Sequence, residues 1–343
     1  MKAIVIHTAK DLRVETRVPD AVGPGQVRVR IEAGGICGSD LHYYLHGGFG
    51  AIRLREPMIL GHEIAGTVIE APEGPLEVGD KVAVSPSRPC HKCLYCNENI
   101  FNQCLNMRFY GSAMPMPHIQ GAFCEELVAD ATQCHLISPE IPVEIAAFCE
   151  PLSVVLHGFS RAGSVAGKRV LVTGCGPIGA LCVLVARAKG ATEVVVTDVI
   201  DNVLNIAQKT GADQAINVLA NPDWTNRFSA DKGHFDVMFE ASGNQSAVCA
   251  GLTVLRPRAT LVQLGLGGDV TIPQNTIVAK EIEIRGAFRF HEEFAEAVDM
   301  VNANALNLAP LLTKRFAIAD AVAAFELAAD RNHAMKVQLD FTK

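Results

Sequence analysis

The stretch RVLVTGCGPIGALCVLVARAKG (169–190) decides the fold. The segment RVLVT is apolar and mostly β-branched after its first residue, which is typical of a buried strand. The segment PIGALCVLVARAKG has the apolar pattern of a helix that ends at Gly190. Because glycines separate the two segments, the stretch predicts a strand, a tight turn and a helix. Residues 170–186 carry no charge, but the glycine turn in their middle excludes a membrane-spanning helix.

Strands and helices continue to alternate beyond this stretch. NVLNIAQKTGA (202–212) has the pattern of a helix, and four segments have the composition of strands: EVVVTDV (193–199), AINV (215–218), FDVMFEASG (235–243) and ATLVQLGLGG (259–268). This alternation predicts an α/β fold with a parallel, doubly wound sheet over residues 151–285.

The segments on either side of residues 151–285 have a different residue pattern. Apolar and polar residues alternate between turns, as in short antiparallel strands, in VRVRIEAGG (27–35), TVIEAPEGPLEVGDKVAVSP (67–86) and GAFCEELVAD (121–130). VQLDF (337–341) has the pattern of a closing strand. A chain of 343 residues exceeds what one core usually serves. We therefore expect a second, β-rich domain made from residues 1–150 together with 286–343.

The glycine turn has the pattern of a dinucleotide-binding site. Gly174, Gly176 and Gly179 form G-x-G-x-x-G directly after a strand, and Pro177 and Ile178 open the helix. The first glycine permits the turn, the second lets a pyrophosphate approach the backbone, and the third permits close packing of helix on strand. The N–H groups at the start of the helix favour phosphate. The alternative is a glycine turn in a sheet protein that binds no nucleotide.

The residue that ends the next strand indicates which dinucleotide is bound. Asp198 lies 24 residues after Gly174, where an acid can hydrogen-bond both ribose hydroxyls. Val199 and Ile200 follow it, with no arginine or lysine beside them in the sequence to receive a 2′-phosphate. The pattern therefore favours NAD over NADP.

Four cysteines form a compact metal-binding pattern. They follow C-x2-C-x2-C-x7-C in a polar, loop-like segment: Cys90, Cys93, Cys96 and Cys104. Four thiolates satisfy a tetrahedral zinc and leave no open position, so we expect a structural site. An iron–sulfur cluster is the alternative, because it too is held by thiolates.

A second set of possible ligands is scattered over three segments. ICGSDLHYY (36–44) contains Cys37, GHEIAGTVIE (61–70) contains His62 and Glu63, and AAFCEPLSV contains Glu150. Taken singly, each has an ordinary structural explanation, such as a turn histidine or an acid at a helix N-terminus. Together they offer the sulfur, nitrogen and carboxylate of a catalytic zinc, which keeps one position open for water or substrate.

The composition limits the class of function and the compartment. Hydrophobic residues make up 49% and charged residues 20%, as in a well-packed protein, and the net charge of −7 argues against nucleic-acid binding. The N-terminus MKAIVIHTAKDLRVE has only a very short apolar run, and the eleven cysteines are an odd number. We therefore expect no signal peptide, reduced thiols, no membrane partner and a cytoplasmic protein.

The order and spacing of these motifs resemble the zinc-dependent medium-chain alcohol dehydrogenases. The stretches that carry the resemblance are GGICGSDLHYY, GHE-x-x-G, the four-cysteine loop and VTGCGPIG, and together they span essentially the whole chain. Within that family the chain is most similar to the polyol branch. The resemblance implies a GroES-like catalytic domain, an inserted Rossmann domain, one catalytic and one structural zinc, and a dimer or tetramer.

The resemblance also assigns roles to single residues. It places the catalytic zinc on Cys37, His62 and either Glu63 or Glu150, and which glutamate binds directly stays open. Zinc would lower the pKa of the substrate hydroxyl, and Ser39 followed by His42 would pass the released proton toward solvent. The substrate would be a polyol or a sugar acid.

Candidates for contacting substrate lie in two segments. Tyr43 lies next to the proton relay, and Arg289 in GAFRF would meet the carboxylate of a sugar acid, with Arg108 as second candidate. Arg289 could instead hold the zinc-site glutamate or its water. The alternative to an enzyme is a catalytically silent NAD-binding sensor. Such a protein should have lost a zinc ligand or the proton relay.

Overall fold

The computed structural model describes residues 1–343 and divides the chain into two compact units. The first unit contains Met1–Ser153, Phe290–Asp330 and Lys336–Lys343. The second contains Val154–Arg289 and Arg331–Met335. The short segment Arg331–Met335 differs from the expected division, because the sequence pattern assigns everything after residue 285 to the first domain.

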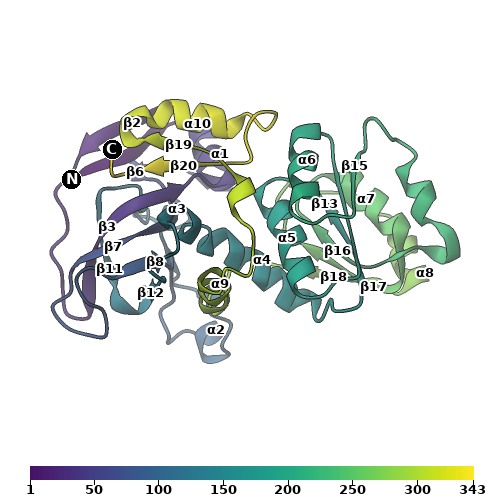
Figure 1. Cartoon of the computed structure of the whole chain (residues 1–343), viewed down its shortest axis with the longest axis horizontal. Coiled ribbons are helices and arrows are strands. Elements are labelled where there is room, and N and C mark those ends of the chain that lie inside the picture. Colours follow the sequence, from purple (N-terminus) through teal and green to yellow (C-terminus); the bar gives the residue numbers. More distant parts are fainter. The chain divides into compact units, whose positions relative to one another are not determined.

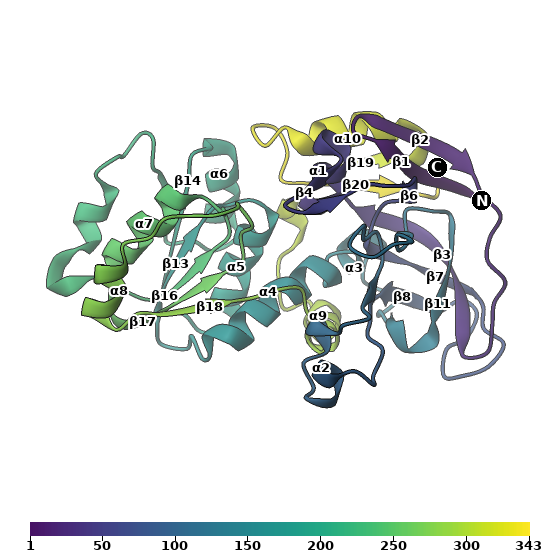
Figure 2. The same cartoon turned by 180° about the vertical axis from the view of Figure 1, so that it is seen from behind.

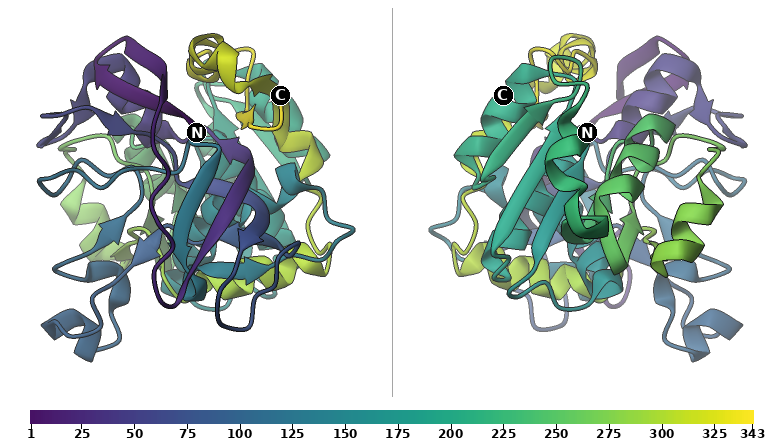
Figure 3. Two further views of the ribbon diagram at one scale, coloured as in Figure 1. Left: turned by 90° about the vertical axis from the view of Figure 1, so that its left-hand side faces the viewer. Right: turned by 90° about the vertical axis from the view of Figure 1, so that its right-hand side faces the viewer.

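A sheet of seven strands forms the centre of the first unit (Figure 1). Its order is β12-β8-β7-β3-β20-β19, and β11 also pairs with β3. The strands are β3 (Gln26–Gly35), β7 (Glu63–Glu70), β8 (Lys81–Val84), β11 (Glu126–Asp130), β12 (Cys134–Leu136), β19 (Leu312–Ala317) and β20 (Lys336–Asp340). The last strand, β20, thus pairs with β3 from near the start of the chain. The two chain ends, marked N and C in Figure 3, both belong to this unit.

The alternation read from VRVRIEAGG holds in this sheet. Val27, Val29 and Ile31 of β3 are fully buried, whereas Arg28 and Arg30 point to the other side and pair with carboxylates. The expected closing strand is present as β20, and its five residues are buried. Apolar alternation therefore places one face of these strands in the core of the unit.

Smaller elements complete the first unit. Its other strands are β1 (Lys2–Thr8), β2 (Asp11–Thr16), β4 (Gly48–Phe49), β5 (Ile52–Arg53), β6 (Met58–Ile59), β9 (Ser87–Arg88) and β10 (Arg108–Phe109). Its helices are α1 (Gly38–His46), α2 (Leu94–Asn97), α3 (Val143–Ala146), the start of α4 (Cys149–Ala162), α9 (Glu293–Asn302) and α10 (Ala321–Ala329). Its 3₁₀ turns are η1 (Phe101–Gln103), η2 (Ala131–Gln133), η5 (Ala309–Leu311) and η6 (Ile318–Asp320).

The second unit is a parallel sheet of six strands in the order β15-β14-β13-β16-β17-β18. The strands are β13 (Arg169–Thr173), β14 (Glu193–Asp198), β15 (Gln214–Asn217), β16 (Phe235–Glu240), β17 (Leu255–Gln263) and β18 (Glu283–Gly286). The strand order reverses between β13 and β16, and ligands bind beyond the carboxyl ends of the strands at such a point. The predicted doubly wound fold is confirmed.

Helices cover both faces of this sheet (Figures 1 and 2). One face carries α5 (Pro177–Ala188) and α6 (Asp201–Lys209), and the other carries α7 (Gln245–Val254) and α8 (Gln274–Lys280). The turns η3 (Trp224–Phe228) and η4 (Ala230–Lys232) precede β16. The uncharged stretch 170–186 is divided between β13 and α5, as the sequence predicts.

One other segment has the length and composition of a membrane span. Residues Val143–Ala162 pass that test, but 67% of the tested window is buried inside the protein. The segment consists of α3 and α4, and such burial is typical of a core helix.

Candidate functional site

Each glycine of the turn after β13 has the role expected of a dinucleotide fingerprint. Gly174 has a φ of +82°, and a Cβ there would lie 2.7 Å from the backbone nitrogen of Ser242. A Cβ on Gly179 would lie 1.8 Å from the carbonyl oxygen of Gly174, so the helix packs closely on the turn. Gly176 is the N-cap of α5, and a Cβ there would meet only a side chain at 3.8 Å. The turn therefore has the open, hydrogen-bond-donating shape that a pyrophosphate needs.

Asp198 is fixed beside this turn by backbone hydrogen bonds. Its Oδ2 accepts the N–H of Cys175 at 2.6 Å, and its Oδ1 accepts the N–H groups of Val199 at 2.6 Å and Ile200 at 3.1 Å. The side chain is 4% exposed. The glycine turn and the acid that follows β14 thus form one rigid arrangement, as a ribose-binding acid requires.

A cation lies near Asp198 in space, although none follows it directly in the sequence. The guanidinium of Arg331 lies 3.3 Å from Asp198 Oδ2, although the two residues are 133 positions apart. The segment Arg331–Met335 belongs to the second unit, which explains how a residue from the end of the chain reaches this turn. Sequence reasoning missed Arg331 because it considered only the residues next to Asp198.

The four cysteines of the loop lie close together. They are Cys90, Cys93, Cys96 and Cys104, and their sulfurs all lie within 4.8 Å of one another. The sulfur of Cys93 is 3.5 Å from that of Cys96 and 3.9 Å from that of Cys104. Four sulfurs bound at about 2.3 Å to one tetrahedral zinc would lie about 3.8 Å apart, so the group fits that metal.

Hydrogen bonds around the loop favour thiolates. The Cys104 sulfur accepts the N–H of Cys90 at 3.2 Å and of Asn106 at 3.4 Å. Hydrogen bonds from the backbone at Lys92 and from the Asn106 side chain lower the pKa of Cys90 to about 6, whereas burial raises that of Cys104 to about 12. Bound metal would hold all four as thiolates, since the thiolate is the ligand.

Asp40 connects two of the segments that carry the other candidate ligands. It is fully buried in α1, its Oδ2 accepts the N–H of Cys37 at 3.0 Å, and its Oδ1 accepts the N–H of Gly61 at 3.1 Å. Cys37 and His62 are therefore held at fixed positions by one carboxylate. The sequence contains a signal for this role, because an acid three residues after an N-cap is the pattern of a capping box.

His62 carries a buried nitrogen without a partner. Its Nδ1 has no hydrogen bond and lies 3.9 Å from Asp40 Oδ1, and the residue is 5% exposed. Cys37 faces the same group of charges: burial and the charge of Glu63 raise the pKa of its thiol to about 12. An unsatisfied imidazole, a half-buried thiol and two buried carboxylates that influence one another electrostatically fit a zinc site.

Glu63 is held by a buried lysine that sequence reasoning missed. Lys336 Nζ donates to both carboxylate oxygens of Glu63 at 2.7 Å and to the carbonyl oxygen of Ile36 at 3.2 Å. These three bonds use all three N–H groups of the ammonium. A Cβ on Gly35 would lie 2.0 Å from Glu63 Oε2, so a glycine there makes room for the carboxylate.

Glu150 is buried in the first turn of α4 and lacks such a partner. It is 5% exposed, and no protein group hydrogen-bonds its carboxylate. Burial raises its pKa well above the ordinary value, and the charge of His62 opposes this rise. A metal cation would supply the positive charge that this carboxylate lacks.

The candidate relay and substrate residues differ in exposure. Ser39 lies beside Cys37 and opposes the rise in the pKa of its thiol. His42 lies exposed on the same helix, where partial desolvation and the charge of His46 lower its pKa. Tyr43 is 2% exposed, and its hydroxyl accepts the N–H of Ala113 at 3.1 Å. The structure thus holds Tyr43 in the core of the first unit.

The two arginine candidates lie in different places. Arg289 is the last residue of the long segment of the second unit, has a φ of +54°, and its guanidinium lies 5.1 Å from the centre of the Phe288 ring. Arg108 is exposed in β10, which pairs with β9.

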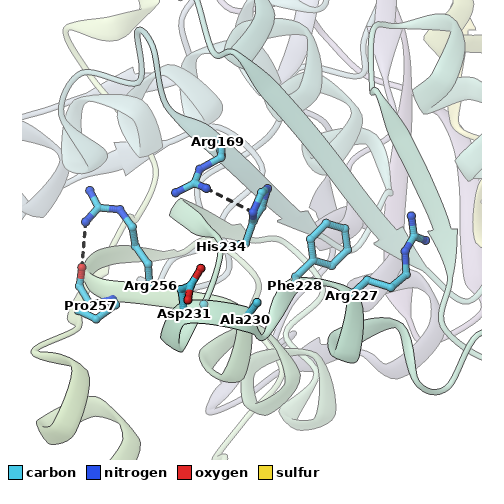
Figure 4. A pocket seen from close by; sticks show the side chains of 9 residues that line it. Arg169, Arg227, Phe228, Ala230, Asp231, His234, Arg256 and Pro257 are labelled. Atoms are coloured by element: carbon cyan, nitrogen blue, oxygen red, sulfur yellow. Dashed lines mark hydrogen bonds between the residues drawn. The ribbon is translucent and has the colours of Figure 1, made fainter.

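A cavity in the second unit is not the dinucleotide site (Figure 4). It measures about 300 Å³ and is lined by residues at the amino ends of the parallel strands, including Arg169, His234 and Arg256. Asp236 pairs with both arginines, and Glu193 lies 2.6 Å from the ring of His234. The cavity is therefore at the opposite sheet edge from the glycine turn, and its charges are compensated. A second cavity of about 420 Å³ lies beside α6 and β15.

Comparisons with known proteins agree with this architecture. Residues 23–139 match the alcohol dehydrogenase GroES-like domain, and residues 177–303 match the zinc-binding dehydrogenase family. L-idonate 5-dehydrogenase (NAD(P)(+)) of Escherichia coli is 43% identical over 316 residues, 91% of either chain. Sorbitol dehydrogenase of Gallus gallus is 35% identical over 98% of this chain and 95% of its own length.

A solved structure agrees in fold over almost the whole chain. The crystal structure of L-idonate 5-dehydrogenase from Escherichia coli superposes with a TM-score of 0.96 at 40% identity, and the match covers 99% of this chain and 98% of that one. The predicted GroES-like and Rossmann folds are confirmed. The chain therefore belongs to the zinc-dependent medium-chain alcohol dehydrogenase family, in the branch with the polyol dehydrogenases, and is an oxidoreductase that acts on CH–OH groups.

Proposed function

We propose that this chain oxidises a secondary hydroxyl of a sugar acid, L-idonate, to 5-ketogluconate with NAD as hydride acceptor. The observation that carries the proposal is the buried Glu150 carboxylate, whose pKa responds to the charges of both His62 and Cys37. A thiol, an imidazole and a carboxylate are the ligand types of a catalytic zinc with one open position. The 43% identity with an L-idonate 5-dehydrogenase supports the choice of substrate.

Of the two glutamates, we infer that Glu150 binds the metal directly. Both oxygens of Glu63 already accept hydrogen bonds from Lys336, so a metal would compete with a buried ion pair. The Glu150 carboxylate makes no such ion pair, and burial raises its pKa well above the ordinary value, although the charges of His62 and Lys336 oppose this rise. Glu63 then has a positioning role beside the site.

The reaction would divide between the cofactors and the protein. Bound zinc would lower the pKa of the substrate hydroxyl, and the dinucleotide would accept the hydride. Ser39, which lies beside Cys37, would take the released proton, and His42 on the exposed side of the same helix would pass it to solvent.

Partner, compartment and metal assignments belong to the same proposal. We infer one catalytic zinc and one structural zinc in the four-cysteine loop, a small-molecule substrate, a dimer or tetramer, and a cytoplasmic location. The close packing of the four sulfurs supports zinc in the loop.

A substrate panel tests the proposed function. Native enzyme with NAD should form NADH with L-idonate, and a chelator should stop the reaction. Oxidation of sorbitol with none of L-idonate would reject the sugar-acid substrate and leave a polyol dehydrogenase. No reduction with either substrate would favour a catalytically silent sensor.

The variant Arg289→Gln refines the panel. If Arg289 receives the substrate carboxylate, the variant should lose activity with L-idonate far more than with neutral polyols. An equal loss with all substrates would mean that Arg289 orders the zinc site instead.

A further inference from the structure

The last residues of three neighbouring strands form a polar row at the carboxyl edge of the parallel sheet. Glu240 ends β16, and its register partners are Thr173 at the end of β13 and Gln263 at the end of β17. Glu240 is fully buried. The strand order reverses between β13 and β16, and doubly wound sheets bind ligands beyond this edge at such a point. A buried acid therefore lies at the edge of the sheet that carries the glycine turn.

The carboxylate of Glu240 accepts hydrogen bonds from both neighbouring strands and from the loop after its own strand. Its Oε1 accepts the hydroxyl of Thr173 at 3.4 Å, the N–H of Ser242 at 2.8 Å and the Ser242 hydroxyl. Its Oε2 accepts the N–H of Gly243 at 2.9 Å and the side-chain amide of Gln263 at 2.5 Å. These five donors are neutral, so the carboxylate is held here by hydrogen bonds.

The same contacts connect two loops to the glycine turn. A Cβ on Gly174 would lie 2.7 Å from the backbone nitrogen of Ser242, so the loop after β16 packs directly on the turn. A Cβ on Gly265 would lie 2.2 Å from the nitrogen of Gly243 and 2.8 Å from Glu240 Oε2, so the loop after β17 packs on the same group. The carbonyl oxygen of Glu240 also accepts the N–H of Gly265 at 2.8 Å. One residue thus fixes three loops relative to one another.

We propose that Glu240 is a positioning residue for the dinucleotide, which holds the loops after β13, β16 and β17 in the arrangement that binds the cofactor. The proposal rests on the proposed function, because it requires a dinucleotide at the glycine turn. Glu240 acts through the loops and not by contact, since its side chain is fully buried. Loops that are ordered before binding save the free energy that their ordering would otherwise cost. Loss of Glu240 should therefore weaken cofactor binding rather than slow the chemical step.

The variant Glu240→Gln tests this role. It keeps the length of the side chain but offers one acceptor oxygen instead of two. Either orientation of its amide places the NH₂ group against a backbone N–H, of Ser242 or of Gly243. Calorimetric titration of the zinc-loaded variant should show that NADH binds about tenfold more weakly. The KM for NAD should rise by a similar factor, whereas kcat at saturating NAD should not fall.

Asp236→Asn is the matched control. Asp236 is a carboxylate at the amino end of the same strand, is 12% exposed and accepts hydrogen bonds from Arg169 and Arg256. Both variants should lower the melting temperature, but Asp236→Asn should leave NADH affinity unchanged, because the glycine turn lies at the opposite edge of the sheet. Equal losses of NADH affinity in the two variants would overturn the proposal. A lower melting temperature of Glu240→Gln with unchanged NADH affinity would do the same.

Thr173→Val is a milder variant that keeps the proposal testable if Glu240→Gln does not fold. Thr173 is fully buried, and its hydroxyl donates to Glu240 Oε1. Valine has nearly the same shape and lacks only this donor. NADH affinity should fall about threefold, as expected for the loss of one hydrogen bond. Native affinity in this variant would reject the role of Glu240.

The outcomes separate this proposal from the proposed function. Native enzyme that binds NADH, together with variants at Glu240 and Thr173 that bind it equally well, would reject the positioning role and leave the dehydrogenase intact. Native enzyme that binds no NADH would reject both.

Discussion

At the scale of single residues, the two glutamates near Cys37 have different environments and should respond differently to the same substitution. Glu63→Gln leaves the buried Lys336 ammonium without its counter-charge, which costs about 3–5 kcal/mol. Glu150→Gln removes a buried carboxylate that makes no direct ion pair, so the variant should lose less stability than Glu63→Gln but should lose one zinc per chain. Urea unfolding of the chelated variants and metal analysis of the untreated ones measure both effects. Loss of zinc in Glu63→Gln with full retention in Glu150→Gln would reverse the assignment.

Residue types were easier to predict than residue partners. Cys37, His62 and Glu150 stand out because sulfur, nitrogen and carboxylate ligands have a recognisable chemistry. Lys336 stayed hidden because its partner Glu63 is 273 positions away and a lone lysine in a strand is ordinary. Arg331 stayed hidden for the same reason, at 133 positions from Asp198. Long-range ion pairs have no local sequence signal.

At the scale of elements, we expect the four-cysteine loop to stabilise the fold as a structural metal site. Its helix α2 has only four residues and η1 only three, so they offer little stability without metal. Cys93→Ser should lower the melting temperature and release one zinc, while folded enzyme at low temperature keeps its turnover. A calorimetric scan with metal analysis measures this. Loss of turnover with an unchanged melting temperature would show that the loop is not structural.

The packing of β12 on α9 should make stability depend on pH. His135 lies 5.0 Å from the Phe294 ring, and burial lowers its pKa, although Asp299 opposes this. The unfolded chain, with a histidine pKa of about 6.5, then binds the proton first, so stability is lost as pH falls from about 6.5 toward the lower folded value. His135→Gln should lose less stability than native protein between pH 7.5 and 5.5. Equal losses in urea unfolding would contradict the shift.

The elements themselves were well predicted because their patterns are local. Alternation identified β3, and the buried run before Gly174 identified β13. The capping box at Asp40 is present in the sequence, but nothing local shows that its second oxygen accepts the N–H of Gly61.

At the scale of the whole molecule, the sequence predicts one domain of residues 1–150 with 286–343 and a second of residues 151–285. The structure groups Arg331–Met335 with Val154–Arg289 in its second unit. That segment has no strand or helix pattern of its own. Arg331 in that segment contacts Asp198 of the second unit. Sequence periodicity does not show such a contact, so it assigned the segment to the first domain.

Zinc content and turnover of Cys37→Ser, measured on one preparation, test the central claim most directly. The account predicts two zinc ions per native chain, one per variant chain, and no NADH formation by the variant with L-idonate or sorbitol. Binding of NADH should be retained, because Cys37 and the glycine turn belong to different units. Undiminished turnover in a variant that has lost one zinc would contradict a catalytic metal at Cys37, His62 and Glu150.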